Sequence, residues 1–238
     1  MSITRRGRWG TVTLCLWKIS NFLSNWLFPS RYRARRMDRE FDKKFGVDTQ
    51  GIIELEGLQI TGENLRHGSG YEQTKPADFE KLMSALKIRY EDFVFVDFGS
   101  GKGRGLLLAS NYSFRKIIGV EFATELHEAA QENIRRYRNH AQQCRNFELY
   151  CQDAVDFPIP RDQVVFYFYN PFNEEVMAKV LANIRQSIEN HPREIFILYC
   201  NSVHRDLVRH YGFAELKSNR WHTVYRSMTC ERLPSLSH

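Results

Sequence analysis

The chain has 238 residues, of which 42% are hydrophobic, enough for one α/β domain with a short appendage and too apolar for a generally disordered chain. The net charge of +6 is concentrated in residues 1–40, where nine Lys and Arg and two acidic residues give +7, while the remainder holds 25 basic and 26 acidic residues. The main domain therefore lacks the positive field typical of nucleic-acid binding, and we expect no nucleic-acid partner.

The five cysteines point to a reducing compartment. Their number is odd and no C-x-x-C occurs, which speaks against both a disulfide framework and a zinc site, and no other metal site is expected. Cys151 and Cys200 lie in apolar runs, so they are predicted to be small buried hydrophobic side chains. We expect an intracellular, cytoplasmic protein.

Residues 1–45 are predicted to form a helical extension with amphipathic and basic character. Apolar residues recur every three or four positions over 9–28, while Lys18 and several polar residues argue against a transmembrane span. No small-residue cleavage site follows, so a signal peptide is not expected. The helix could cap the main domain or enter a groove of a partner protein. Alternatively, residues 9–36 could lie on an anionic membrane surface.

Residues 46–92 are predicted to connect this extension to the main domain. A basic helix over 31–46 ends at Gly46, a loop rich in glycine follows, and Pro76 begins a lead-in helix over 76–88.

Residues 93–238 alternate between strand and helix patterns. The strands are expected at 93–98, 116–122, 147–153, 164–170, 194–200, 213–218 and 221–229. The helices between them are expected at 102–111, 124–141, 174–190 and 203–211. Nearly continuous apolar strands indicate an α/β, doubly wound, mostly parallel sheet covered on both faces, and the last two strands read as a closing hairpin.

The loop after the first of these strands is rich in glycine: Gly99, Ser100, Gly101, Lys102 and Gly103. In an open parallel sheet a ligand binds beyond the carboxyl ends of the strands, where this loop lies. The dinucleotide fingerprint G-x-G-x-x-G fails because Arg104 stands at the third glycine, and Asp97 would repel a diphosphate. A cationic nucleoside without phosphate, S-adenosylmethionine, fits both the glycines and the carboxylate.

Two further acids end the next two strands. Glu121 can accept hydrogen bonds from both ribose hydroxyls, and Asp153 can accept one from the adenine amino group. Each acid alone would more simply be a helix cap, but three at successive strand ends favour this cofactor.

The segments "VDFGSGKGRG", "IIGVEF", "CQDA" and "FYFYNPF" resemble the successive motifs of class I S-adenosylmethionine-dependent methyltransferases over residues 70–230. The resemblance implies a Rossmann-like, seven-stranded sheet whose last strand is antiparallel. It also implies a set of cofactor-binding residues: Asp97, Gly99, Ser100, Gly101, Gly103, Glu121, Phe122, Asp153 and Ala154.

The lead-in "GYEQTKPADFEKLM" is similar to that of the non-SET histone-lysine methyltransferases (the disruptor of telomeric silencing type) and of related small protein-lysine methyltransferases. This likeness implies that Tyr71 and Thr74 line the methionine end of the cofactor. It also gives Asn170 and Phe172 of "YNPF" a place beside the acceptor nitrogen, although this tetrapeptide has one proline fewer than the Asn-Pro-Pro-Tyr of amide and adenine methyltransferases.

The sequence therefore predicts methylation of a protein nitrogen, on lysine. Asn170, with its carbonyl oxygen, Tyr71 and Phe172 are the predicted catalytic residues, and Asn170 also counts among those near the cofactor. A small-molecule or nucleic-acid base acceptor remains an alternative, as does a non-catalytic module that binds the cofactor and docks at membranes. A lysine must lose its proton before it reacts, and Tyr71 and His67 are the only weak candidates for the base.

Overall fold

The computed structural model of the chain describes residues 40–53 and 71–228. Residues 45–53 and the whole of the second range belong to one compact unit. The predicted amphipathic helix lies outside the described residues, so its capping and membrane-surface roles stay predictions. None of the helices within the described ranges is both long and apolar enough to cross a membrane.

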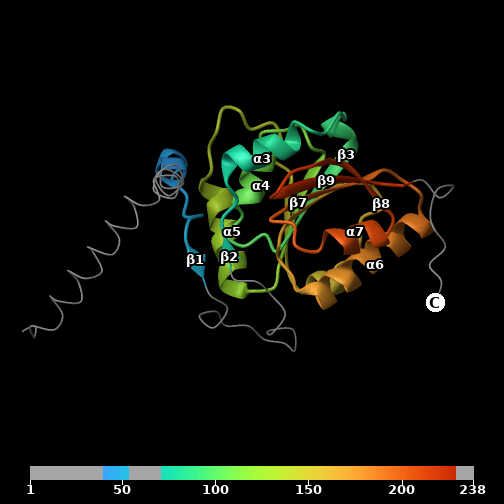
Figure 1. Cartoon of the computed structure of the whole chain (residues 1–238). Helices are drawn as coiled ribbons and strands as arrows, with labels where there is room; N and C mark the ends of the chain where they lie inside the picture. The colour runs from blue at the N-terminus through green and yellow to red at the C-terminus, as the bar shows by residue number, and fades with distance from the viewer. Residues whose placement is uncertain (1–39, 54–70, 229–238) are drawn as a thin grey trace, which may run out of the picture. The chain divides into compact units, whose positions relative to one another are not determined.

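The predicted alternation of strands and helices from residue 93 is confirmed (Figure 1). The strands of the main sheet are β3 (Phe93–Phe98), β4 (Lys116–Glu121), β5 (Phe147–Cys151), β6 (Gln163–Tyr169), β7 (Ile195–Cys200), β8 (Phe213–Ser218) and β9 (His222–Ser227). The helices are α3 (Pro76–Met83), α4 (Arg104–Ala109), α5 (Thr124–Arg136), α6 (Glu174–Asn190) and α7 (Arg205–His210), with 3₁₀ turns η3 (Tyr90–Asp92) and η4 (Ala154–Asp156).

The seven strands lie in the order β5-β4-β3-β6-β7-β9-β8. The first five are parallel to one another, and β9 runs antiparallel to both of its neighbours. The predicted seven-stranded, mostly parallel sheet with an antiparallel last strand is therefore confirmed. The order reverses beside β3, so the loop after β3 lies at the topological switch point, where open α/β sheets bind their ligands.

Helices cover both faces of the sheet, with α6 and α7 on one side and α3, α4 and α5 on the other (Figure 1). Alternate residues of β3 face opposite ways. Val94, Val96 and Phe98 join the core with α6, whereas Phe95 contacts Phe79 of α3 at a ring distance of 5.9 Å. Asp97 lies two residues after Phe95 in β3, so its side chain points to the same face of the sheet, the face covered by α3 and α4.

Three helices are shorter than their patterns predicted, two of them for a clear local reason. The first helix after β3 begins at Arg104 rather than 102, because Gly103 adopts a left-handed φ of 85° and ends the turn. The helix expected to reach residue 141 ends at Arg136, because Tyr137 turns to an extended ψ of 125° and buries its ring. The lead-in helix ends at Met83 instead of 88.

Two features of the connector and the sheet edge were not predicted. A two-stranded antiparallel ribbon, β1 (Ile52–Ile53) with β2 (Tyr71–Glu72), lies within the predicted connector. The prediction that Cys151 is buried is wrong, because β5 is an edge strand and Cys151 at its end is exposed. Cys200, on the inner strand β7, is buried as expected.

Candidate functional site

The glycine turn after β3 requires its glycines. Gly99, Gly101 and Gly103 all have positive φ, at 71°, 53° and 85°, which other residues rarely adopt. The amides of Gly99 and Ser100 both donate to the carbonyl of Val120, at 2.9 and 3.1 Å, so β4 holds the start of the turn. A β-carbon on Gly99 would lie only 2.7 Å from Cβ of Pro171. The turn therefore packs directly on the segment that follows β6.

Asp97 is a buried carboxylate without a partner. Its side chain is 3% exposed, and within the described part of the chain it makes no hydrogen bond and no ion pair. Burial first, and then the nearby Glu121, raise the pKa of Asp97 well above its ordinary value. Keeping such a carboxylate charged requires a cation or hydrogen-bond donors, which a ligand can supply.

Glu121, at the end of β4, is buried and its carboxylate binds the backbone of the glycine turn. Its Oε2 accepts the Gly101 N–H at 2.8 Å, and its Oε1 accepts the Ala123 N–H at 2.9 Å. Burial raises the pKa of Glu121, and these backbone hydrogen bonds partly offset the rise. The backbone of Phe122 also contributes, and since a carboxylate accepts about four hydrogen bonds, Glu121 can still accept from a ligand hydroxyl.

A small hollow of about 10 Å³ opens between the glycine turn and the residues before α3. Asp97, Thr74 and Tyr167 line it together with Arg104, which is 1% exposed and donates from Nε to Oγ1 of Thr49 at 2.6 Å. One hollow thus contains a carboxylate and a guanidinium. The hollow has room for about one water molecule, so it shows only that Asp97 and Arg104 line the same space. The ammonium and carboxylate of a ligand bound at this edge of the sheet would suit their opposite charges.

Thr74 lines the hollow, and its role at the methionine end of the cofactor stays a prediction. Its Oγ1 lies 3.1 Å from the hydroxyl of Tyr167, and that hydroxyl lies 3.4 Å from Sγ of Cys200. Tyr71 lies in β2, three residues before Thr74, and its side chain is outside the described atoms. The role of Tyr71 therefore stays a prediction.

Asn170 follows β6 with a left-handed φ of 44°, uncommon for a residue other than glycine. Its Oδ1 accepts from the hydroxyl of Tyr199 at a long 3.4 Å. Such local strain is frequent at binding and catalytic sites. Phe172 packs in the core against Phe98 and Phe168 and is 9% exposed, so little of its ring is available to an acceptor.

The residues expected around the nucleoside lie on neighbouring strand ends. Phe122 is half-buried directly after β4, and Ala154 is buried at the start of η4. Asp153 is the N-cap of η4, with Oδ1 accepting from the amide of Val155 at 2.9 Å. The capping role foreseen for a single acid is thus real at Asp153, and a second hydrogen bond from a ligand remains compatible with it.

Comparisons with known proteins find likeness in structure but not in sequence. No protein-family model matches the chain. No curated protein matches it either.

Three solved structures illustrate the structural likeness. An RNA methyltransferase from Salinibacter ruber in complex with S-adenosyl-L-homocysteine is 18% identical, with 69% of this chain and 97% of that chain covered and a TM-score of 0.45. A predicted N6-adenine-specific DNA methylase from Listeria monocytogenes is 14% identical, with 66% and 52% covered and a TM-score of 0.49. Magnesium protoporphyrin IX methyltransferase from Synechocystis, with bound SAM, is 15% identical, with 63% and 75% covered and a TM-score of 0.40.

The strand order and the reversed strand β9 define the fold. The chain has the Rossmann-like fold of class I methyltransferases. The identities are too low to transfer an acceptor, and the three proteins named above carry different ones in their names. What the chain does must therefore be argued from its own residues.

Some residues at the site were not singled out from the sequence. Arg104 was noted only because it breaks a glycine fingerprint, yet it is a fully buried charge at the hollow. An arginine followed by an apolar run, as in "RGLLLA", is the one local signal that could have marked it. Tyr167 sits inside the strand "QVVFYFY" and gave no such signal, because its role depends on Thr74 and Cys200 from other segments.

Proposed function

We propose that the chain is an S-adenosylmethionine-dependent methyltransferase. The observation that carries this proposal is the pair of buried carboxylates, Asp97 and Glu121, on either side of a glycine turn at the switch point of the sheet. Asp97 forms no ion pair within the described residues, although Arg104 lines the same hollow, and a cationic ligand would relieve the cost of its burial. A diphosphate would instead add negative charge to this site.

Different residues of the chain would contact different parts of the ligand. Asp97 and Arg104 would face the ammonium and the carboxylate of the methionine part, and Thr74 would line the same end. Glu121 would accept from the ribose hydroxyls, and Asp153, with Phe122 and Ala154 beside it, would hold the adenine. When bound, the sulfonium supplies a methyl group that leaves its electron pair on sulfur, so the protein has mainly to align the acceptor and exclude water.

We further propose that the acceptor is a nitrogen of a protein, on a lysine side chain. The lead-in before α3 supports this proposal, since Thr74 of that segment lines the hollow. Asn170 supports it too, because its strained backbone places a side-chain amide oxygen at the end of β6, where it could accept an N–H and orient the lone pair of the amine. A protein partner is part of this proposal.

Calorimetry tests whether the chain binds the proposed cofactor. Purified chain should bind S-adenosylmethionine and S-adenosylhomocysteine, and Asp97→Ala should weaken binding of the sulfonium form at least tenfold. Binding of NADH or ATP, together with no heat of binding from S-adenosylmethionine or S-adenosylhomocysteine, would refute the proposal.

The acceptor is tested separately with methyl-labelled cofactor and a cell extract. Label should appear in protein and survive as methyl-lysine after acid hydrolysis, and the Asp97→Ala variant should give none. Label found only in nucleic acid or small molecules would refute the lysine proposal but leave the methyltransferase standing.

A further inference from the structure

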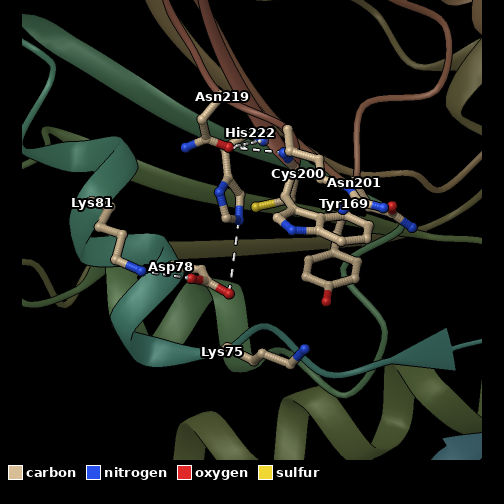
Figure 2. Close-up of a pocket in the computed structure, with 10 residues that line it drawn as sticks. Lys75, Asp78, Lys81, Tyr169, Cys200, Asn201, Asn219 and His222 are labelled. Atoms are coloured by element: carbon tan, nitrogen blue, oxygen red, sulfur yellow. Dashed lines mark hydrogen bonds and ion pairs between the residues drawn. The ribbon is translucent and has the colours of Figure 1, made fainter. Parts of the chain in front are cut away.

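A second, larger pocket of about 450 Å³ adjoins the hollow described above (Figure 2). Side chains of α3 and of the residue just before it form one wall: Lys75, Asp78 and Lys81. The tight turn between β8 and β9 forms another wall, with Arg220, Trp221 and His222. Tyr169, Cys200 and Asn201, at or just beyond the carboxyl ends of β6 and β7, form the floor. The pocket therefore opens at the same edge of the sheet as the glycine turn.

This pocket and the hollow share a lining residue and are linked by one buried side chain. Tyr169 lines both of them. The hydroxyl of Tyr167 contacts Thr74, which lines the hollow, and Cys200, which lines the larger pocket. The two cavities are therefore neighbours, and methyl transfer requires the acceptor nitrogen to come within about 3–3.5 Å of the methyl carbon, so the side chain of Tyr169 must leave that line open.

His222 and Asp78 form a pair inside this pocket. Nε2 of His222 lies 3.7 Å from Oδ2 of Asp78, and the two side chains are 12% and 25% exposed. Figure 2 shows the carboxylate below the imidazole. The carboxylate favours a proton on the nitrogen that faces it, which leaves the lone pair of a neutral ring on Nδ1. Within the described ranges Nδ1 has no hydrogen-bond partner.

Burial, reinforced by nearby cations, favours the neutral form of His222. Burial lowers the pKa of His222 first; Asp78 opposes the shift, whereas the cations Lys81, Lys75 and Arg205 reinforce it. Cys200, opposite His222 in the sheet, is itself protonated, because burial raises its pKa to about 12. The ring can therefore accept a proton near neutral pH.

The same cations act on a bound amine. Lys75, Lys81 and Arg220 together outnumber the single carboxylate of Asp78 among the charged groups that line the pocket. Like charges disfavour an ammonium and lower its pKa, so an amine held here is more easily deprotonated than in water.

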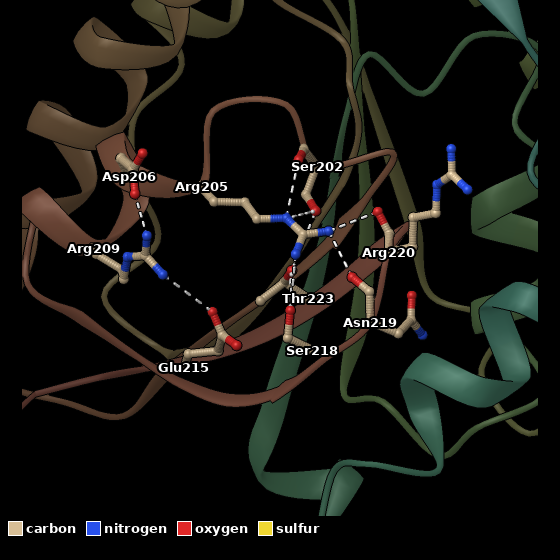
Figure 3. A network of polar contacts seen from close by, with 9 residues as sticks. All are labelled: Ser202, Arg205, Asp206, Arg209, Glu215, Ser218, Asn219, Arg220 and Thr223. Carbon is tan, nitrogen blue, oxygen red and sulfur yellow. Dashed lines mark hydrogen bonds and ion pairs between the residues drawn. The ribbon is translucent and has the colours of Figure 1, made fainter.

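The turn that carries His222 is fixed in place by Arg205 of α7 (Figure 3). Its guanidinium donates to the carbonyls of Asn219 and Arg220, at 2.7 and 2.9 Å, and to the hydroxyls of Ser218 and Ser202, at 3.0 and 2.8 Å. Oδ1 of Asn219 in turn accepts the backbone amide of His222 at 2.9 Å. Such support holds a reacting group in position without reorganisation.

We propose that this pocket binds the acceptor amine and that His222, whose tautomer the nearby Asp78 favours, is the general base that deprotonates it. The inference rests on the proposed function. The ammonium of the acceptor gives one proton to Nδ1, which becomes imidazolium, and the nitrogen keeps an electron pair. With that pair it would bond to the methyl carbon while the bond from this carbon to sulfur breaks and leaves its electron pair on sulfur. The proton then passes from the imidazolium to water.

The test compares His222→Gln with the wild type and with a matched control, His191→Gln, at an exposed histidine after α6. Initial rates of label transfer to the extract proteins that the wild type labels are measured from about pH 6 to pH 9. A general base contributes about 10²–10⁴-fold. His222→Gln should therefore lose at least about 100-fold near pH 7, and its residual rate should rise about tenfold per pH unit, while the wild type and the control level off.

A second readout needs no bound cofactor. Titration of the His222 ring by NMR should give a pKa below the ordinary histidine value, and Asp78→Asn should lower it further, because the carboxylate that raises it is gone. Circular dichroism and calorimetric binding of the cofactor check that each variant is folded.

The outcomes separate the two proposals. If the rates of His222→Gln stay within threefold of the wild type and follow the same pH profile, His222 is not the general base. The proposal that the chain is a methyltransferase would be unaffected by that result. If the pKa of His222 is the same in Asp78→Asn as in the wild type, the proposed influence of Asp78 on His222 is refuted. A wild type that binds the cofactor but labels nothing would overturn the proposed function, and this inference with it.

Discussion

The contact between Gly99 and Pro171 joins the glycine turn to the segment that holds Asn170, and one substitution tests it. In Gly99→Ala the new β-carbon would lie 2.7 Å from Cβ of Pro171, closer than such atoms can approach. Gly99 also has a φ of +71°. Gly46 offers a matched control, because its φ is +68° and no atom lies within 4 Å of the position its β-carbon would take.

Both variants place a β-carbon on a residue with a left-handed backbone conformation, but only in Gly99→Ala does that carbon also collide with Pro171. A left-handed conformation costs a residue with a β-carbon about 1–2 kcal/mol. Overpacking a rigid contact adds about 1–3 kcal/mol. We therefore expect Gly46→Ala to lower the free energy of unfolding by about 1–2 kcal/mol and Gly99→Ala to lower it by about 2–5 kcal/mol.

Urea denaturation of both variants, followed by tryptophan fluorescence or circular dichroism, measures the difference. Gly99→Ala should also weaken binding of S-adenosylhomocysteine, because relief of the clash moves the turn or the segment after β6, whereas Gly46→Ala should bind like the wild type. Equal destabilisation by the two variants, within about 0.5 kcal/mol, would refute the argument, since the contact with Pro171 would then cost nothing.

Two further predictions concern the buried carboxylates. Because the pKa of Asp97 is raised in the folded protein, the folded state keeps a proton that the unfolded chain releases, and the free energy of unfolding falls as pH rises above the ordinary carboxyl value. Without ligand, Asp97→Asn should therefore gain stability relative to the wild type from about pH 4 to pH 8 in urea titrations; a gain that shrinks with pH would contradict this. In Glu121→Gln the new amide group would face the N–H of either Gly101 or Ala123, so the variant should lose about 1–3 kcal/mol, whereas the control Glu132→Gln, at a partly exposed position on the surface of α5, should change the melting temperature much less. Thermal unfolding of the pair checks this, and equal melting temperatures would argue against the role of Glu121 in the turn.

The elements of the sheet could be predicted because their signals are local. Apolar runs of strand length, the helical spacing over 174–190 and the hairpin residues before His222 each depend on neighbouring residues. The ends of helices were less well predicted. Tyr137 ends α5 because its ring finds a buried place beside Phe45, at 5.0 Å between rings, and no pattern in the helix encodes that contact.

The candidate site was predicted in part for the same reason. Glycines at three positive φ values and acids at strand ends are properties of the chain near each residue, so the sequence determined the glycine turn and placed Asp97 and Glu121 beside it. Only the tertiary structure decided that Phe172 packs in the core, that Cys151 is exposed on an edge strand and that His222 meets Asp78. Those outcomes depend on which strands become neighbours, and strand order is settled by burial and packing between distant segments, which no short stretch of sequence contains.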